Sequence, residues 1–197
     1  MTKTVNKKNS IDKKILRQNI MDDRASKMKS DLVFYMVLIA LVVIAIVFRC
    51  FFVSSYTVSG TSMYPTLNDG DWVWVNKLVK PQRGDIVVAY DEYDDKALVK
   101  RVIAIEGDLI SLVWSDEGYV VVIETVDGQI IYEEYDGVTL PAIRPDRTGV
   151  LSSTPYLVTE GYFLMGDNRN DSNDSRNPEI QCFEKEKIIG VVMNDEG

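Results

Sequence analysis

The chemistry open to this chain is limited by one absence, because its 197 residues include no histidine. This excludes Ser-His-Asp and Cys-His catalysis, histidine-containing zinc sites and the usual general base at neutral pH. The two cysteines, Cys50 and Cys182, are too few for a disulfide framework or a four-cysteine zinc site, and we expect both to be free thiols. Acid–base work therefore falls to lysine, tyrosine or carboxylate side chains. No cluster has metal-ligand spacing, so the sequence predicts no metal and no cofactor.

Ser62 is the candidate nucleophile. It lies in the octet GTSMYPTL, residues 60–67. Gly60 allows positive φ or a close backbone approach, and Pro65 keeps Tyr64 out of the helical region. Ser62 is therefore expected in rigid, non-helical backbone. An ordinary turn has the same composition, so the assignment depends on whether the chain also provides a base.

Lys100 is the candidate base. In the segment ALVKRVIAI, residues 97–105, strand alternation places Lys100 on the same face as Leu98 and Val102. Desolvation by apolar neighbours disfavours the ammonium and lowers the lysine pKa from about 10.4. The free amine, which becomes more abundant as this pKa falls, can accept the proton of a serine hydroxyl. The alternative interpretation is a lysine at a strand edge whose amine reaches solvent.

Arg101 lies on the opposite face of the same predicted strand, and a buried guanidinium stays charged and needs a carboxylate partner. The segment GDNRNDSNDSR, residues 166–176, is the obvious source of one. It does not fit a calcium loop, because counting from Asp167 puts Arg169 at a ligand position. Counting from Asp171 gives no glycine at the sixth position. The segment is therefore expected to supply the carboxylate partner of Arg101.

A membrane anchor precedes these residues. Residues 32–48 carry no charge, and the apolar segment continues past Arg49 to residue 53, which gives about 33 Å of helix, enough to span a bilayer. Arg49 can extend its guanidinium to the headgroups. The alternative is a cleaved signal peptide, but its apolar region should be about 7 to 15 residues long, and this one is longer and follows about 30 polar residues.

The charge changes sign across the anchor. Residues 1–31 hold nine Lys or Arg and four Asp, whereas the remainder holds thirteen basic and twenty-six acidic residues. The near-helical spacing of apolar residues 11, 15, 16 and 20 indicates a basic segment at the membrane surface. The positive-inside rule predicts a cytoplasmic N-terminus, a single span over residues 32–53 and an extracytoplasmic domain over residues 54–197. The acidic body argues against a nucleic-acid partner.

The body after residue 54 reads as short strands separated by turn residues, so we predict a mostly β fold. The expected strands are residues 56–59, 71–76, 85–90, 98–105, 109–114, 119–126, 129–134, 162–165 and 188–193. Hairpin turns at 115–118 and 127–128 predict a small inserted β subdomain over residues 109–160, which ends in a loop-like run from 138 to 156. Trp72 and Trp74 share one face of a strand, either as membrane-interface residues or as core aromatics.

Four segments resemble, in order, the sequence boxes of bacterial type I signal peptidases. They are SGTSMYPTL (59–67), RGDIVV (83–88), KRVIAIEGD (100–108) and GDNRNDSNDSR (166–176). They cover most of the predicted catalytic body, whereas residues 1–30 and 109–160 match only in kind. The resemblance implies a signal-peptidase-like β-barrel or sheet body behind one transmembrane helix. The single span and short insert are similar to the compact Gram-positive type, and Lys100 occupies the position where the eukaryotic reticulum type has histidine.

The resemblance also implies roles for individual residues. Ser62 would be the nucleophile and Lys100 the general base of a Ser-Lys dyad that works through an acyl-enzyme. Ser172 would contact and orient the lysine amine. The supporting acid–arginine network would consist of Asp174, Arg176, Asp167 and Arg101. Some members place a serine hydroxyl two residues before the nucleophile as an oxyanion donor, and this chain has Gly60 there, which leaves the Ser62 N–H and an unidentified second donor.

The implied substrates are secretory pre-proteins, held by their signal peptides in the same lipid bilayer and extended along a strand edge of the enzyme. Met63, Leu98 and Val102 are the predicted substrate-binding residues. Two alternatives stay open: an anchored β module that binds peptides without cleaving them, and a relative dedicated to one substrate. Self-cleaving repressors also use a Ser-Lys pair, but a DNA-binding domain should then precede it, and here an apolar segment does.

Overall fold

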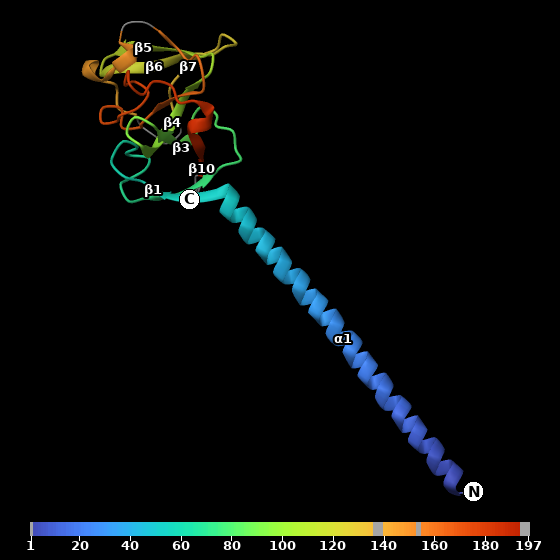
Figure 1. Ribbon diagram of the computed structural model, residues 1–197. Helices are drawn as coiled ribbons and strands as arrows, with labels where there is room; N and C mark the ends of the chain where they lie inside the picture. Colours follow the sequence, from blue (N-terminus) through green and yellow to red (C-terminus); the bar gives the residue numbers. More distant parts are fainter. Residues whose placement is uncertain (1, 136–139, 153–154, 194–197) are drawn as a thin grey trace. The chain divides into compact units, whose positions relative to one another are not determined.

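The computed structural model describes residues 2–135, 140–152 and 155–193. By its internal contacts the chain forms two compact units, Met1–Phe51 and Phe52–Gly197. Figure 1 traces the helical first unit from blue to cyan and the β-rich second unit from cyan through green and yellow to red. Residues 136–139, 153 and 154 lie outside the described residues, and of these 138, 139, 153 and 154 belong to the run expected as loop from 138 to 156.

The first unit is a single helix, α1 (Thr2–Phe52), of 51 residues. Neither proline nor glycine occurs in this segment, so nothing breaks the hydrogen-bond ladder between the basic segment and the apolar one. The two predicted segments are therefore one continuous helix. The stretch Arg17–Arg49 reaches a mean hydropathy of 2.9 and is long and apolar enough to cross a membrane. Its apolar side chains are exposed, as expected of a surface that lipid would cover.

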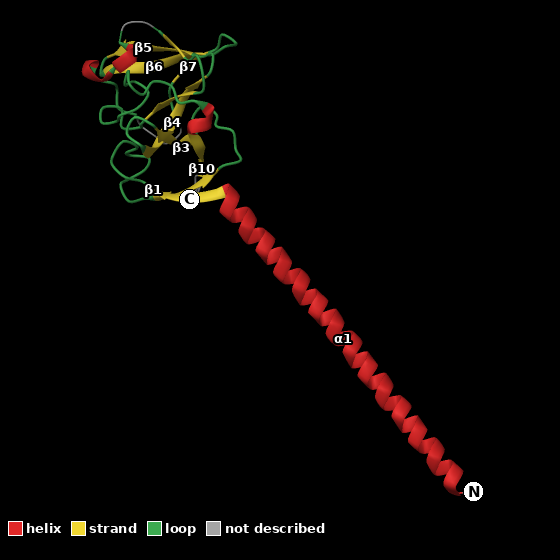
Figure 2. Cartoon of the chain, viewed as in Figure 1, coloured by secondary structure: helices red, strands yellow, loops and turns green. Residues whose placement is uncertain are grey.

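The second unit contains a six-stranded antiparallel sheet, whose strand β4 carries four of the ten predicted site residues, while the other six lie in loops. Its strands, in spatial order, are β1 (Val53–Thr57), β2 (Trp72–Asn76), β10 (Ile188–Met193), β3 (Ile86–Asp91), β4 (Lys96–Ile105) and β9 (Tyr162–Met165). Within the described residues no pairing joins β1 to β9, so the sheet is not a closed barrel. The strand-rich body in Figure 2 confirms the mostly β prediction.

A second antiparallel sheet lies beside the first in this unit (Figure 1). In spatial order it consists of β7 (Ile130–Tyr132), β6 (Gly118–Glu124), β5 (Leu109–Ser115) and β8 (Tyr156–Leu157). The two-residue strand β8 is too short to leave a periodic signal in the sequence and was expected as loop. Short 3₁₀ turns occur at Pro145–Arg147, Gly149–Leu151 and Lys185–Lys187.

The core of the second unit is continuous between the two sheets. Ile103 of β4 and Phe163 of β9 belong to the same buried cluster as Ile110 and Ile123 of the second sheet. This shared cluster explains why residues 52–197 form one compact unit. The second sheet falls within the range expected for an inserted subdomain, but whether that range is a separate subdomain stays a prediction.

Candidate active site

Ser62 and Lys100 meet directly. The Lys100 Nζ donates a hydrogen bond of 2.6 Å to the Ser62 Oγ and one of 3.1 Å to the Val99 carbonyl oxygen. Lys100 is only 3% exposed, and this burial lowers the pKa of its amine to about 8. The free amine is therefore a substantial fraction of the population near neutral pH. A hydroxyl and a buried amine in this geometry can form a nucleophile–base pair.

Two different elements fix the pair. Lys100 lies in the middle of β4, where it is opposite Val87 of β3. Ser62 lies in the turn between β1 and β2. This turn is closed by two backbone hydrogen bonds, from the Val58 N–H to the Asp71 carbonyl oxygen and from the Gly70 N–H to the Val58 carbonyl oxygen. Gly60 has φ of +90°, and its N–H donates to an Asp69 carboxylate oxygen at 2.7 Å. The left-handed conformation that this turn requires favours glycine.

Met63 follows Ser62 and is almost completely buried. It packs in a cluster with Val58, Val73 and Val75, so it anchors the Ser62 turn to one face of the first sheet. The structure thus gives Met63 a packing role. Its predicted contact with substrate stays a prediction.

The loop after β9 holds the Ser62 turn from the other side. The Asn168 N–H donates to the Ser62 carbonyl oxygen at 3.0 Å, and the Asn168 side chain donates to the Thr61 carbonyl oxygen at 3.1 Å. The Thr61 hydroxyl donates to Asp171 at 2.9 Å. Gly166 packs so closely that an added Cβ would lie 2.3 Å from the Ser62 carbonyl oxygen. Chain segments more than a hundred residues apart therefore define the position of Ser62 together.

Ser172 lies against Gly166 in this loop. Its Oγ is buried and has no hydrogen-bond partner among the described residues. The hydroxyl lies near enough to the Asp174 carboxylate to help lower the pKa of that acid, after the larger effects of burial and of Arg176. No hydrogen bond joins Ser172 to Lys100 in the described part of the chain. The lysine-orienting role of Ser172 therefore stays a prediction.

Asp174 and Arg176 form a buried bidentate ion pair, with hydrogen bonds of 2.8 Å from Nε and from Nη2. Burial raises the pKa of the Asp174 carboxyl, but the hydrogen bonds and charge of Arg176 outweigh it and keep this pKa below its usual range. Asp174 also accepts a hydrogen bond from the Gly166 N–H at 3.0 Å. The pair thus supports the backbone that contacts Ser62.

Arg101 and Asp167 form a second buried bidentate pair, with hydrogen bonds of 2.8 and 2.6 Å. The Arg101 guanidinium also donates to the Gly84 carbonyl oxygen at 2.7 Å and lies 4.3 Å from the centre of the Tyr135 ring. Thr66 donates its hydroxyl to Asp167 as well. The structure therefore brings together the four acids and arginines of the predicted network in two pairs.

Two members of the network were not predicted from sequence. Glu133 forms a buried bidentate ion pair with Arg169, and Tyr135 donates a hydrogen bond of 3.1 Å to Glu133. Strand alternation places Glu133 on the same face as Ile131, and this inward position was the available signal. The partner could not be read from sequence, because Arg169 is 36 residues away.

Leu98 and Val102 share a cluster on the other face of the first sheet, with Val102 fully buried and Leu98 partly buried. This packing does not test whether the two side chains contact substrate, so that contact stays a prediction. β4 itself has an open edge: β9 pairs with it only from Arg101 to Ile105, whereas β3 pairs along residues 96–101. Residues 96–100 therefore have a strand on one side only among the described residues.

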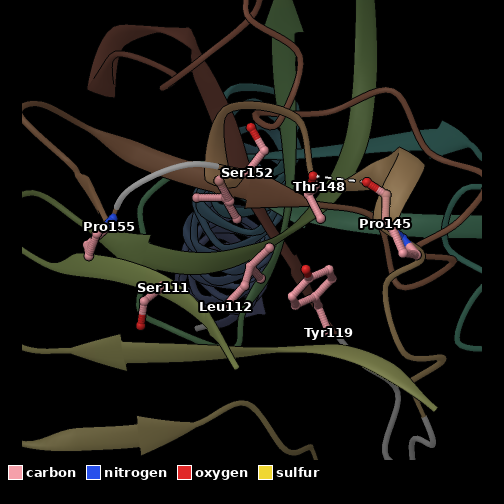
Figure 3. Close-up of a pocket in the computed structure, with 8 residues that line it drawn as sticks. Ser111, Leu112, Tyr119, Pro145, Thr148, Ser152 and Pro155 are labelled. Atoms are coloured by element: carbon pink, nitrogen blue, oxygen red, sulfur yellow. Dashed lines mark hydrogen bonds between the residues drawn. The ribbon is translucent and has the colours of Figure 1, made fainter. Parts of the chain in front are cut away.

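Figure 3 shows a cavity of about 320 Å³ between the second sheet and the loop that follows it. Hydroxyl and aromatic side chains line it, including Ser111, Tyr119 and Thr148, and the Thr148 hydroxyl donates to the Pro145 carbonyl oxygen at 3.3 Å. None of the predicted site residues lines this cavity. The described residues also contain no group of acids or cysteines that could hold a metal ion.

Replacing Gly166 tests the tight packing against Ser62. A methyl group there must displace the Ser62 carbonyl or the Ser172 hydroxyl, so we expect Gly166→Ala to fold but to lower kcat by about 10- to 100-fold. Gly190→Ala is the matched control, since its Cβ would lie 2.5 Å from the Asn76 carbonyl oxygen, and its nearest neighbours belong to Asn76 and Val75 rather than to Ser62. Steady-state kinetics of both variants distinguish the cases. Equal kcat losses would show that crowding alone, and not displacement of Ser62, is responsible.

Comparison with known proteins identifies the family to which the chain belongs. The family model described as signal peptidase, peptidase S26, matches residues 31–194. Signal peptidase I S of Bacillus subtilis (strain 168) is 36% identical over 176 residues, which cover 86% of this chain and 90% of that protein. A signal peptidase I of Bacillus licheniformis is 35% identical over 162 residues, with coverage of 78% and 82%. A crystal structure of a signal peptidase I from Enterococcus faecalis V583 is 22% identical, covers 58% of this chain and 98% of that chain, and has a TM-score of 0.40.

The chain therefore belongs to the signal peptidase family, peptidase S26. Three relatives that are 34% to 36% identical are signal peptidases I that match over most of their own length, so the enzyme is a hydrolase of the signal peptidase I type. The apolar helix α1 and these relatives together indicate a membrane-anchored protein that processes signal peptides.

Proposed function

We propose that this chain is a serine endopeptidase that removes N-terminal signal peptides from secreted pre-proteins with a Ser62–Lys100 dyad. The observation that carries the proposal is the 2.6 Å hydrogen bond between a serine hydroxyl and an amine buried enough to lower its pKa to about 8. A neutral amine is the form of lysine that can act as a general base.

The reaction runs in two halves. The Lys100 amine takes the Ser62 proton as Oγ attacks the scissile carbonyl carbon, and the resulting ammonium gives that proton to the leaving amine as the peptide bond breaks. This leaves an acyl-enzyme ester. The amine, neutral again, then takes a proton from water as that water attacks the ester carbon. The resulting ammonium returns the proton to the Ser62 Oγ as the ester bond breaks, which releases the new carboxyl terminus and restores the Ser62 hydroxyl.

The oxyanion of each tetrahedral intermediate needs hydrogen-bond donors. The Ser62 N–H makes no hydrogen bond among the described residues and is available as one donor. The position two residues earlier is Gly60, whose N–H is already bonded to Asp69. The Thr61 hydroxyl is likewise bonded to Asp171. The Ser62 N–H is therefore the donor that the geometry supports.

The open edge of β4 supports a binding mode for the cleavage region. The backbone of Val102 exchanges hydrogen bonds with the backbone of residues 84 and 85 on the β3 side. By strand alternation, the backbone N–H and C=O groups of Lys100 and Leu98 also point towards β3. The backbone groups of Val99 and Ala97 then face the open edge. An extended peptide that adds there as a strand would pass next to the Lys100 amine.

The proposed topology places the N-terminus in the cytoplasm and the β unit outside it. Residues 1–31 are basic and the remainder is acidic, which supports this orientation under the positive-inside rule. The pre-protein's signal peptide lies in the same bilayer in this arrangement, so enzyme and substrate meet within one membrane.

Trp72 and Trp74 are proposed to contact the lipid headgroups. They are 72% and 40% exposed on β2, which is inconsistent with core aromatics, and the exposed Met193 of β10 is opposite Trp74.

We expect acyl-brominated lipids to quench the tryptophan fluorescence of the reconstituted intact chain. Quenching should fall in Trp72→Tyr/Trp74→Tyr, which retains only Trp114. The same fractional quenching in both proteins would contradict the membrane contact.

The test of the proposed function is cleavage of a labelled pre-protein in detergent by the intact chain and by Ser62→Ala. We expect the wild-type chain to release the signal peptide and Ser62→Ala to release none above the uncatalysed background. Cleavage by a folded Ser62→Ala at the wild-type rate would exclude Ser62 as the nucleophile. A wild-type chain that binds the pre-protein without cleaving it would instead indicate a binding module.

A further inference from the structure

Glu133 lies outside the predicted site but reaches into it. It follows β7, and its N–H donates to the Val121 carbonyl oxygen of β6 at 3.2 Å, which fixes its backbone to the second sheet. Its carboxylate forms a bidentate ion pair with Arg169 in the loop after β9. The two side chains are 2% and 3% exposed, so the pair is almost completely desolvated.

Arg169 connects this pair to the nucleophile. Its Nε donates to the Gly166 carbonyl oxygen at 3.1 Å, and its own carbonyl oxygen accepts a hydrogen bond of 2.6 Å from Arg176. Gly166 packs directly against the Ser62 carbonyl oxygen and the Ser172 side chain. A displacement of the Arg169 guanidinium would therefore be transmitted to Ser62 through Gly166 alone.

Packing alone does not hold Arg169 in place. A cavity of about 150 Å³ borders the pair and is lined by Glu133, Arg169 and Ile143 among others. Tyr135 closes another side, because its hydroxyl donates to Glu133 at 3.1 Å and its ring stacks under Arg101. The ion pair and not steric contact therefore fixes the guanidinium that binds the Gly166 carbonyl.

We infer that Glu133 is a positioning residue of the peptidase reaction, which holds the Ser62 turn through Arg169 and Gly166. The inference rests on the proposed role of Ser62 and Lys100. A role in stability alone explains the pair less well, since a buried ion pair can often be replaced by apolar residues of similar size at no cost in stability. Placement of a reacting group is far less tolerant, because an error of about 1 Å can cost about 100-fold in rate.

The decisive variant is the double replacement Glu133→Met/Arg169→Met in the intact chain, assayed on a labelled pre-protein in detergent. It removes both charges and leaves no unpaired buried ion, so the chain is expected to fold. It also removes the donor to the Gly166 carbonyl. We expect kcat to fall by about 10- to 100-fold while KM stays within about twofold, because the loss is confined to the placement of Ser62.

Ile123→Ala is the control for stability loss in the same sheet. Ile123 is a buried core residue of β6 whose side chain makes no hydrogen bond, and this truncation is expected to lower the unfolding temperature but not kcat. The single variant Glu133→Gln leaves the Arg169 charge buried without its partner, so it should be less stable than the double variant and equally slow.

A double variant with wild-type kcat would overturn the inference, and so would one that does not fold, since the pair would then serve stability. Ser62→Ala in the same assay separates this failure from failure of the proposed function. If Ser62→Ala cleaves like the wild type, both are wrong. If Ser62→Ala is inactive and the double variant is as fast as the wild type, only the role of Glu133 is wrong.

Discussion

Lys100→Met is expected to abolish cleavage of pre-proteins, with a fall in kcat of at least about 10³-fold. Methionine matches the length of the lysine stem but cannot accept the proton of the Ser62 hydroxyl, which the amine contacts at 2.6 Å. Because a nucleophile and its base act as a unit, Ser62→Ala/Lys100→Met should retain the same residual activity as either single variant. Initial rates of pre-protein cleavage by the four proteins give this comparison. Losses that multiply in the double variant would show that the two residues act independently.

The same replacement should make the fold more stable at neutral pH. Burial lowers the pKa of Lys100 from 10.5 to about 8, so the unfolded chain binds this proton more tightly than the folded chain does. This difference lowers the free energy of unfolding by roughly 3 kcal/mol. The loss of stability is fully present below about pH 8 and disappears as the pH rises towards 10.5. Lys100→Met removes this loss. Unfolding in urea, followed at pH 7, would therefore show an inactive variant that is at least as stable as the wild type.

Arg176→Met is expected to lower the free energy of unfolding by about 3–5 kcal/mol, because it leaves the Asp174 carboxylate buried without its partner. Asp174 is 1% exposed, and two further carbonyl oxygens, of Arg147 and Arg169, lose their donor. Urea unfolding of the intact chain in detergent at pH 7 measures the change. Asp174→Leu/Arg176→Met is the control and should recover most of the loss, since it removes the unpaired charge as well.

The effect of Arg176→Met should depend on pH. In the wild type the pKa of Asp174 lies below its usual value. The ion pair therefore contributes its full stabilisation when the pH is above that usual pKa, and the stabilisation is lost as the pH falls through the lower pKa of the folded state. In the variant, burial without a counter-charge raises this pKa instead. The stability difference between the two proteins should therefore be largest at high pH, begin to shrink as the pH falls through the raised pKa of the variant, and shrink further below about pH 4 as the wild-type pair is protonated. A difference that is independent of pH would show that Asp174 does not carry the effect.

The strand pattern was predictable because short alternating runs between turn residues are a local property of the sequence. β9 and β10 have the predicted bounds, and the β5–β6 hairpin turns where Ser115 and Gly118 were expected to turn it. β8 was missed because two residues cannot show a period. The continuous helix α1 also differs from the two segments that were expected, although the lack of proline and glycine before Phe52 was the local sign of it.

The candidate site was predictable only where a motif or a charge imbalance marked it. Desolvation of Lys100 followed from its apolar neighbours, and the need of Arg101 for a carboxylate followed from its place in a buried strand. Glu133 and Tyr135 directly follow β7 of the second sheet, and their contacts with the arginines depend on the core that the two sheets share. Such contacts depend on tertiary packing, which residue types and spacing do not encode.

The central claim is that the buried Lys100 amine is the general base for Ser62, and the pH dependence of kcat/KM for pre-protein cleavage tests it most directly. The wild-type rate from pH 6 to 10 should rise through an apparent pKa near 8, because burial lowers the pKa of this amine to about 8. A rate that rises only near 10.5, the ordinary value for a solvated lysine, or that does not change over this range, would contradict the claim.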